Sequence, residues 1–260
     1  MFRLLLVACV PMMAAYALGG EPPIPEYTVK KTDEPIVIDG KLTEKTWQLA
    51  PKTIVDTYSN GKREEQFITE VQMAYNDRLL YIGARLPDND VISSGERDQD
   101  NLLAGDTFEV FIDLNNDDQH LWEFHFSPAG VKTSTFVIKP KETDPLFERT
   151  RFGLVFIPWI VSGIQNDTTV TGTLNDSRDD DSEWTVEVAI PYKFLMMPKG
   201  EPTPKPGRVW RMLFTRHEMK RLDKEGNRDN LWIMWSATLI GWCHNPPRWG
   251  KVTFSPEVLK

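Results

Sequence analysis

The chain has 260 residues, of which 40% are hydrophobic and 26% are charged, and its formal net charge is −8. This length and composition allow a sizeable core and exclude a disordered chain. The excess of 38 acidic over 30 basic residues argues against a nucleic-acid-binding protein, which needs a basic surface. Tryptophan is unusually frequent, with nine residues, and its flat ring often serves in recognition. The positions of these indoles therefore guide the functional interpretation.

The N-terminus has the pattern of a secretory signal peptide. Arg3 is followed by a mostly apolar run to Leu18, and the run contains an A-x-A cleavage pattern at residues 15–17. We expect residues 1–20 to be removed and the mature protein to be secreted or periplasmic. No later segment reaches 18 apolar residues, so no membrane span is expected.

Removal of this segment would take Cys9 with it and leave Cys243 as the remaining cysteine. No intrachain disulfide is then expected. Although His244 is adjacent, nothing in the sequence supplies a third group for a nucleophilic site. Cys243 is therefore interpreted as a structural, partly buried thiol.

The next elements are a Pro-rich tether over residues 21–32 and one short helix. Thr43 is the expected N-cap of this helix, and Pro51 ends it. Alternation of apolar and polar residues then dominates the sequence. The expected strands are Gln66–Tyr75, Leu79–Leu86, Thr107–Leu114, Leu121–Phe126, Lys132–Ile138, Thr168–Leu174, Glu183–Ile190, Arg208–His217, Leu231–Trp235 and Lys251–Phe254. The sequence predicts an all-β protein, an antiparallel β-sandwich with one short N-terminal helix, in a single domain over residues 33–256.

Two of these strands carry polar groups on one face. If 107–114 pairs with 121–126, alternation brings Glu109, Asp113, Glu123 and His125 onto a common face. Carboxylates and an imidazole on a sheet face suit hydrogen bonding to a polyhydroxylated ligand. A solvated face with incidental ion pairs is the structural alternative.

The tryptophans divide into two groups. Trp47, Trp184 and Trp210 lie on the apolar phase of their elements and are expected in the core, and Trp249 is expected to pack where the last strand begins. Trp242 lies in the Gly- and Pro-containing loop 241–250, where an indole has fewer core partners. Its flat face would suit stacking on the C–H surface of a sugar ring.

Several ordered sequence blocks resemble family 9 carbohydrate-binding modules. They are Ile36–Leu42 followed by Trp47, then Val71–Asn76 with Leu80–Ile82, Gly105–Asp113, Phe124–Gly130, Trp184–Pro191, and Trp235-Ser236 up to Arg248–Gly250. The blocks span residues 33–254. The resemblance implies a β-sandwich that binds sugars without catalysis, often beside secreted polysaccharide-degrading enzymes, with structural calcium in known members.

The resemblance also implies which residues would contact a sugar. Trp242 matches the second of two aromatic rings that clamp the sugar, whereas Leu103 stands where the first ring is expected. Glu109 matches a sugar-contacting carboxylate, and His125 stands at the position of an arginine. We therefore expect a carbohydrate site of Trp242, Glu109 and His125, with Arg216 and His244 at its rim and an oligo- or polysaccharide as ligand.

A calcium ion is the metal considered. Asp113, Asn115 and Asp117 have the oxygen spacing that begins a calcium loop. The Gly and Glu of an EF-hand are absent, because Asp118 and Phe124 hold those positions. An irregular calcium site or a hydrophilic turn are both compatible with this pattern. Zinc is not expected, because His120 and His125 would point to opposite faces of one strand.

Three other functions are considered. A haem-binding electron-transfer subunit of the related sandwich type would use Met73, Met234 or His217, although both methionines lie on apolar faces. A structural domain associated with a glycoside hydrolase would bind no glycan. Hydrolysis itself would need a pair of carboxylates from Glu109, Glu123 and Asp113 at a defined separation, which the sequence does not give.

Overall fold

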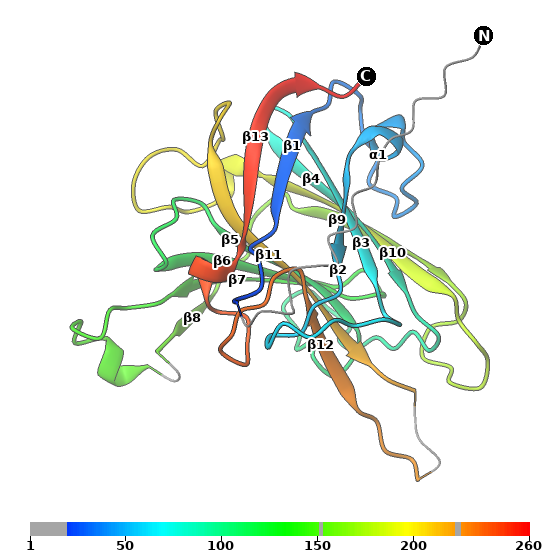
Figure 1. The fold of residues 1–260 in the computed structure, drawn as a ribbon. Coiled ribbons are helices and arrows are strands. Elements are labelled where there is room, and N and C mark those ends of the chain that lie inside the picture. The colour runs from blue at the N-terminus through cyan, green and yellow to red at the C-terminus, as the bar shows by residue number, and fades with distance from the viewer. Residues whose placement is uncertain (1–19, 151–152, 222–224) are drawn as a thin grey trace.

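The computed structural model describes residues 20–150, 153–221 and 225–260 (Figure 1). The expected signal peptide therefore lies, except for Gly20, outside the described residues. In chain order the strands are β1 (Glu26–Lys31), β2 (Lys52–Val55), β3 (Thr69–Tyr75), β4 (Leu79–Pro87), β5 (Thr107–Asp113), β6 (His120–Phe126), β7 (Lys132–Ile138), β8 (Val155–Pro158), β9 (Gln165–Thr171), β10 (Glu183–Pro191), β11 (Val209–Met219), β12 (Asn230–Met234) and β13 (Gly250–Val258). The helical elements are α1 (Lys45–Leu49) and the 3-10 turns η2 (Phe147–Arg149), η3 (Tyr192–Phe194) and η4 (Pro246–Arg248).

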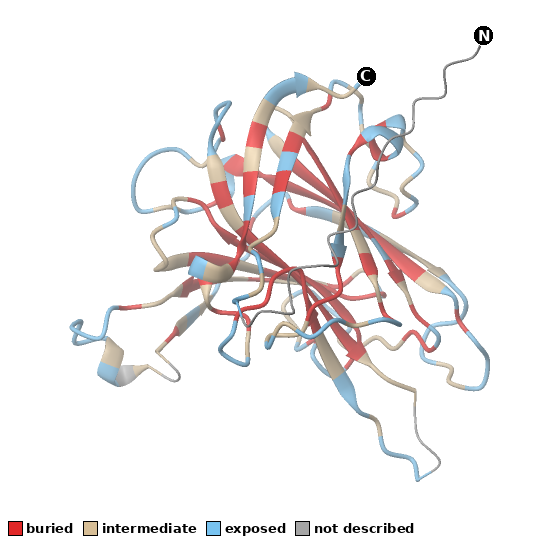
Figure 2. Ribbon diagram, viewed as in Figure 1, coloured by how far each residue is buried: buried red, intermediate tan, exposed pale blue. Residues whose placement is uncertain are grey.

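The strands form one connected sheet in the order β8-β7-β6-β5-β11-β13-β1-β3-β4-β10-β9, with β12 on β11 and β2 on β3. One hydrophobic cluster joins β6, through Trp122 and Phe124, to β10, through Trp184 and Val186. The two ends of the sheet thus share one core, as in a β-sandwich. The buried residues follow the strands of both halves (Figure 2). The predicted fold class is confirmed.

Strand β1 departs from the expected tether and from a purely antiparallel sheet. It pairs in parallel with both β13 and β3, in the middle of the sheet. Tyr27 and Val29 are buried, and the Tyr27 hydroxyl donates to the Pro51 carbonyl at 2.6 Å. The tether over 21–32 is therefore wrong for residues 26–31. The short strand follows a Pro-rich run, so its own sequence does not indicate a strand. Its pairing partners, β13 and β3, lie far away in the sequence.

The predicted short helix is present as α1, and it ends just before Pro51. Its N-cap residue is Glu44, not Thr43, and no side chain caps it there. Instead the backbone N–H of Thr46 donates to the Glu34 carboxylate at 2.6 Å. A carboxylate from outside the helix thus satisfies a first-turn donor that a local cap would otherwise satisfy.

Most of the tryptophans lie where alternation predicts. Trp47, Trp184, Trp210 and Trp249 are all buried, so their assignment to the core is confirmed. Trp159 is the unpredicted exception, because 42% of it is exposed in the segment that follows β8.

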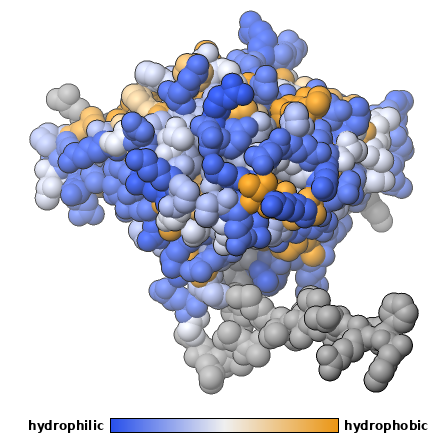
Figure 3. Space-filling view, turned by 90° about the horizontal axis from the view of Figure 1, so that it is seen from above, coloured by the Kyte–Doolittle hydropathy of each residue, from blue (hydrophilic) through white to orange (hydrophobic). Residues whose placement is uncertain are grey.

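None of the helices in the described ranges is long and apolar enough to cross a membrane. The face seen in Figure 3 is mostly hydrophilic, with apolar residues in small separate patches.

Candidate functional site

The predicted meeting of carboxylates and imidazole on one sheet face is present. In the pairing of β5 with β6, Glu109 lies opposite His125 and Phe111 opposite Glu123. On β7, Thr133 and Thr135 lie opposite His125 and Glu123 and continue the same face. Both threonines are partly exposed.

This face is not openly solvated, because the loop between β12 and β13 packs on it. The Phe111 ring lies 5.6 Å from the His244 ring and 5.8 Å from the Trp249 ring, centroid to centroid. The Trp249 indole N–H donates to the Cys243 carbonyl at 2.6 Å and fixes the loop on itself. Phe111 and Leu213, both on the otherwise polar phase, are the sequence signal that this face would be covered.

At the edge of the covering loop lies a group that we call the imidazole–carboxylate chain: His125, Glu123 and His244. Nε2 of His125 lies 2.7 Å from Oε1 of Glu123, and Nε2 of His244 lies 2.9 Å from Oε2. Burial alone would raise the pKa of Glu123, but the hydrogen bonds from the two imidazoles outweigh it and lower that pKa to about 2. Glu123 is thus an anion at neutral pH.

Cys243 adjoins this chain as a buried thiol. Its Sγ lies 3.3 Å from Nδ1 of His244. When His244 donates from Nε2 to Glu123, Nδ1 is left to accept from the thiol. Burial, with the nearby charges of Glu123 and Glu109, raises the pKa of Cys243 well above its usual value, so the thiolate is disfavoured and the expected structural role is supported.

Glu109 lies deeper than expected for a ligand-contacting residue. It is only 1% exposed. One of its oxygens accepts from the Thr107 hydroxyl at 3.0 Å, and the other accepts from the Thr215 hydroxyl. Nδ1 of His125 is 3.9 Å from Glu109. Burial would lower the pKa of His125, but the charge of Glu109 and the bond to Glu123 raise it to about 9. Glu109 therefore stabilises the imidazolium from behind.

Besides the buried Phe111, two further aromatic rings contact His244. Trp242 is half-buried, and its ring lies 5.9 Å from the His244 ring at 76°. Phe156 of β8 lies 5.5 Å from the same imidazole at 87°. Leu103, 36% exposed, supplies no ring at the position where the first was expected. The sequence analysis missed Phe156, Thr133 and Thr135, because β8 was not predicted and β7 carried no functional assignment.

Arg216 was expected at the rim of this site, and that expectation is wrong. It pairs with Phe108 across β11 and β5 and is therefore on the opposite face from Thr215 and Glu109. It is fully buried, its Nε donates to Glu218 at 2.8 Å, and its Nη1 donates to the Pro87 carbonyl at 2.6 Å. Arg216 is two residues from the core residue Phe214 on β11, so the alternation along the strand already indicated that its side chain points into the core.

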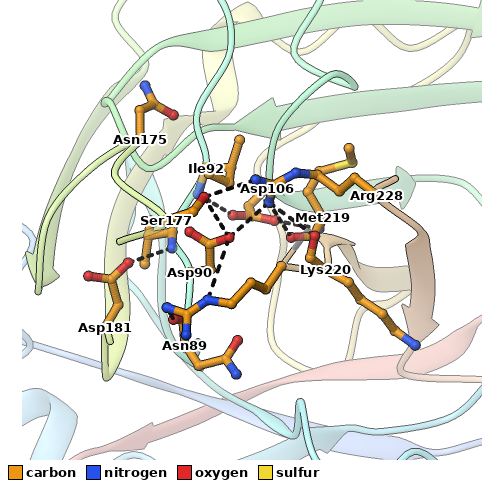
Figure 4. Close-up of polar contacts among 12 residues, drawn as sticks. Asn89, Asp90, Ile92, Asp106, Asn175, Ser177, Asp181, Met219, Lys220 and Arg228 are labelled. Carbon is orange, nitrogen blue, oxygen red and sulfur yellow. Dashed lines mark hydrogen bonds and ion pairs between the residues drawn. The ribbon is translucent and has the colours of Figure 1, made fainter. Parts of the chain in front are cut away.

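The residues around Arg216 belong to a second polar region, which fixes several loops. Figure 4 shows the part of it that contains Asp90, Asp106 and Arg228. Asp106 accepts the backbone N–H groups of Ile92 and Met219 at 2.7 and 2.6 Å. Asp90 accepts from the Ser177 hydroxyl at 2.9 Å and pairs with Arg228 at 3.1 Å. These contacts join the loops that follow β4, β9 and β11.

Within this region lies a set that we call the acidic group: Asp88, Asp106 and Glu218, whose nearest carboxylate oxygens all lie within 4.8 Å of one another. Arg216 pairs with Asp88 at 3.1 Å and with Glu218. Three carboxylates against one guanidinium leave two negative charges uncompensated when all are ionised. Burial is the largest cause that raises the pKa values of all three acids, that of Glu218 to about 7. In the described part of the chain, Oε1 of Glu218 has no hydrogen-bond partner, and Oδ2 of Asp88 has only its ion pair with Arg216.

The loop considered for calcium holds its own carboxylates in hydrogen bonds. Asp113 accepts backbone N–H groups from Asn115, Asp117 and Asp118 at 3.0–3.3 Å. Asp117 accepts from His120 Nδ1 at 2.7 Å and from the Asn115 amide at 2.8 Å. The loop is therefore closed by local hydrogen bonds.

The haem-ligand candidates are all buried. Met73 and Met234 are both buried in the main hydrophobic cluster. His217 is also buried, with Nδ1 3.0 Å from the Gly105 carbonyl. Each of these side chains is occupied in packing or in a backbone contact.

Comparison with known proteins identifies the family of this chain. Residues 38–256 match the model described as carbohydrate family 9 binding domain-like. A putative carbohydrate-binding protein from Bacteroides uniformis ATCC 8492 has a similar structure, with a TM-score of 0.66 and 14% identity over 90% of this chain and 100% of that one.

Two structures of a family 9 carbohydrate-binding module from Caldicellulosiruptor kristjanssonii are also similar. The complex with cellotriose has a TM-score of 0.58 and 17% identity over 89% of this chain and 94% of that one. The complex with glucose has a TM-score of 0.55 and 18% identity over 88% and 96%. At these identities the likeness shows the fold. Among curated proteins, none matches the chain. The extent of the family match shows that the chain belongs to the carbohydrate family 9 binding domain-like family.

Proposed function

We propose that this protein binds carbohydrate, without catalysis, at the surface around the imidazole–carboxylate chain and Trp242. The observation that carries the proposal is that a partly exposed indole lies 5.9 Å from His244, which in turn hydrogen-bonds Glu123. A flat ring suits the C–H face of a sugar, and fixed polar groups suit its hydroxyls. Family membership and neighbours that bind cellotriose and glucose support the same function.

The charge state of the carboxylates at this site favours binding over hydrolysis. A glycoside hydrolase needs one carboxylic acid with a raised pKa as proton donor. Glu123 has a lowered pKa instead, and Glu109 is buried behind His125. Both carboxylates therefore serve as fixed acceptors that hold the imidazoles in place.

A glycan microarray that includes glucose and cello-oligosaccharides tests this proposal. The wild-type protein should retain at least one glycan, and Trp242→Ala should lose at least tenfold in affinity, about 1.4 kcal/mol, with nearly unchanged thermal unfolding. Trp159→Ala, which removes another exposed indole, is the matched control. A visible absorption spectrum of the purified protein with a Soret band would favour the haem alternative, and no retained glycan would favour a structural domain.

We also propose that a calcium ion, implied by the family resemblance, binds at the acidic group. The support is that three carboxylates face one guanidinium and that a buried oxygen of Glu218 has no hydrogen-bond partner among the described residues. Carboxylate oxygens are the ligands that calcium prefers. The ion would stabilise the loops that meet there. The loop of Asp113, Asn115 and Asp117 is the second position.

A chelator titration separates these two positions. Removal of calcium should lower the midpoint of thermal unfolding of the wild-type protein, and Asp88→Asn should abolish that response. Asp113→Asn should preserve it. The opposite pattern would move the ion to the second position, and no response in the wild-type protein would exclude a structural calcium ion.

We further propose that the protein acts outside the cytoplasm in polysaccharide catabolism. The signal-peptide pattern over residues 1–20 and the family resemblance support this assignment. N-terminal sequencing of the protein from the culture medium or periplasm should give a first residue near Glu21. A retained N-terminus in the cytoplasmic fraction would contradict it.

A further inference from the structure

We propose that Phe156 of β8 supplies the second aromatic wall of the carbohydrate site, in place of the ring absent at Leu103. This inference rests on the proposed function and specifies which residues hold the sugar. It moves the site from the end of β5 toward the outer edge of the sheet, where β7 and β8 lie.

The first support is that Phe156 and Trp242 contact the same imidazole, that of His244. The Phe156 ring lies 5.5 Å from the His244 ring at 87°, and Trp242 lies 5.9 Å from it at 76°. Both rings therefore stand edge-on to the imidazole that hydrogen-bonds Glu123. They converge on one polar group.

The second support is exposure. Phe156 is 45% exposed although it belongs to a strand paired with β7. A phenylalanine on a sheet face normally buries more of its ring, because burial of apolar area is its main contribution to stability. An exposed ring next to the nearly buried polar side chains of Glu123 and His244 is instead suited to contact a ligand.

The third support comes from polar side chains on β7, the strand between β6 and the strand that carries Phe156. Thr135 lies opposite Glu123 on β7, and Pro158 of β8 lies opposite Thr135. Thr133 lies opposite His125. The two partly exposed hydroxyls thus extend the row of polar groups toward the strand that carries Phe156, whereas Glu109, toward β11, is buried.

Other aromatic rings near the site fit this role less well. Trp232 lies edge-on to His217 at 5.4 Å, toward the opposite side of the face. Trp159 is exposed to a similar extent as Phe156, but its N–H donates to the carbonyl of Ser134, which lies opposite Phe124 and not opposite Glu123. These two residues therefore provide matched controls.

The experiment measures affinity by calorimetry for the tightest glycan that the wild-type protein retains from a panel including glucose and cellotriose. Phe156→Ala should weaken binding about tenfold, and Phe156→Leu, which keeps apolar bulk but not the flat ring, should weaken it similarly. Phe156→Tyr, which keeps the flat ring, should bind with the affinity of the wild-type protein. Trp159→Ala and Trp232→Ala should each change affinity less than about twofold, within the range of neutral interface positions.

The outcomes distinguish the inference from the proposed function. If Trp242→Ala weakens binding and Phe156→Ala does not, Phe156 does not form the second wall, and the proposed site at Trp242 stands. If Trp232→Ala weakens binding instead of Phe156→Ala, the second wall lies on β12 and the inference is overturned. If the wild-type protein retains no glycan, both the proposed function and the inference fail. Thermal unfolding of each variant verifies that the fold is intact.

Discussion

The imidazole–carboxylate chain and the acidic group are both buried sets of charged side chains, yet they differ in charge compensation. In the first, two imidazoles bond one carboxylate, and the pKa of Glu123 falls to about 2. In the second, one guanidinium faces three carboxylates, and the pKa of Glu218 rises to about 7. Burial acts in the same direction on both acids, so the hydrogen bonds that each acid accepts and the charges of its neighbours decide the sign. The carboxylate of the first group is therefore fully paired within the protein, whereas the second group has more carboxylates than cationic partners.

Removal of the single cation of the acidic group should have the largest effect. Arg216→Gln leaves buried carboxylates without a counter-charge and should lower the free energy of unfolding by about 4 kcal/mol, measured by urea denaturation at pH 8. The raised folded-state pKa of Glu218 means that the folded protein binds more protons than the unfolded chain between pH 4.5 and about 7. Stability from this group therefore falls as pH rises through that range.

The loss in Arg216→Gln should accordingly be smaller at pH 5 than at pH 8. Arg85→Gln, which breaks an exposed ion pair with Glu183, is the control and should cost less than about 1 kcal/mol. Equal losses at both pH values in Arg216→Gln would show that lost packing, and not uncompensated charge, is responsible.

Removal of the shared carboxylate should break the imidazole–carboxylate chain with a somewhat smaller effect. Glu123→Gln leaves His244 without an anionic partner and His125 with Glu109 alone, and it should lower the free energy of unfolding by about 3 kcal/mol. Urea denaturation at pH 6 measures this loss. Glu70→Gln, which breaks an exposed pair with Lys52, is the control. A loss as small as that of the control would mean that the chain is not coupled to stability.

The protonation of His125 should give stability a distinct pH dependence. Its pKa rises from 6.5 to about 9 on folding, so its contribution is complete below pH 6.5 and is lost as pH rises through 9. Glu123 has a lowered pKa, so its contribution is present above pH 4.5 and is lost as pH falls toward 2. The pair therefore stabilises most between pH 4.5 and 6.5.

His125→Gln should remove the part of the alkaline loss due to His125, about 2 kcal/mol, which is less than the full shift implies because the ring keeps some solvent contact. Thermal or urea unfolding of wild type and variant from pH 5 to 10 gives the difference. Parallel curves over this range would contradict a raised pKa for His125.

The smallest expected effect concerns the group behind His125. Thr215→Val removes one of the hydroxyl donors to Glu109 and should lower the free energy of unfolding by about 1 kcal/mol, measured by urea denaturation. Thr107→Val removes the other donor and should act similarly. Unchanged stability in both variants would mean that these two hydrogen bonds to Glu109 do not contribute to the stability of the fold.

Local alternation was sufficient to predict much of the fold and one part of the site. The side-chain period of two placed Trp184 and Trp210 in the core, and it correctly brought Glu109 beside His125 and Glu123 onto the same face. These features depend only on neighbours within a strand or across one pairing. The same rule already indicated that Arg216 points inward, although its charge suggested the surface.

Contacts between segments distant in sequence decided the rest. Pairing with β13 and β3 makes residues 26–31 a central strand, which the sequence of that segment does not specify. The packing of His244 and Trp249 on Phe111 covers the polar face, and β8 brings Phe156 to the same imidazole as Trp242. The sequence by itself therefore determined the β class and the phase of each strand. Only the tertiary structure decided which polar groups are buried, because burial depends on what packs over a face and not on the alternation along it.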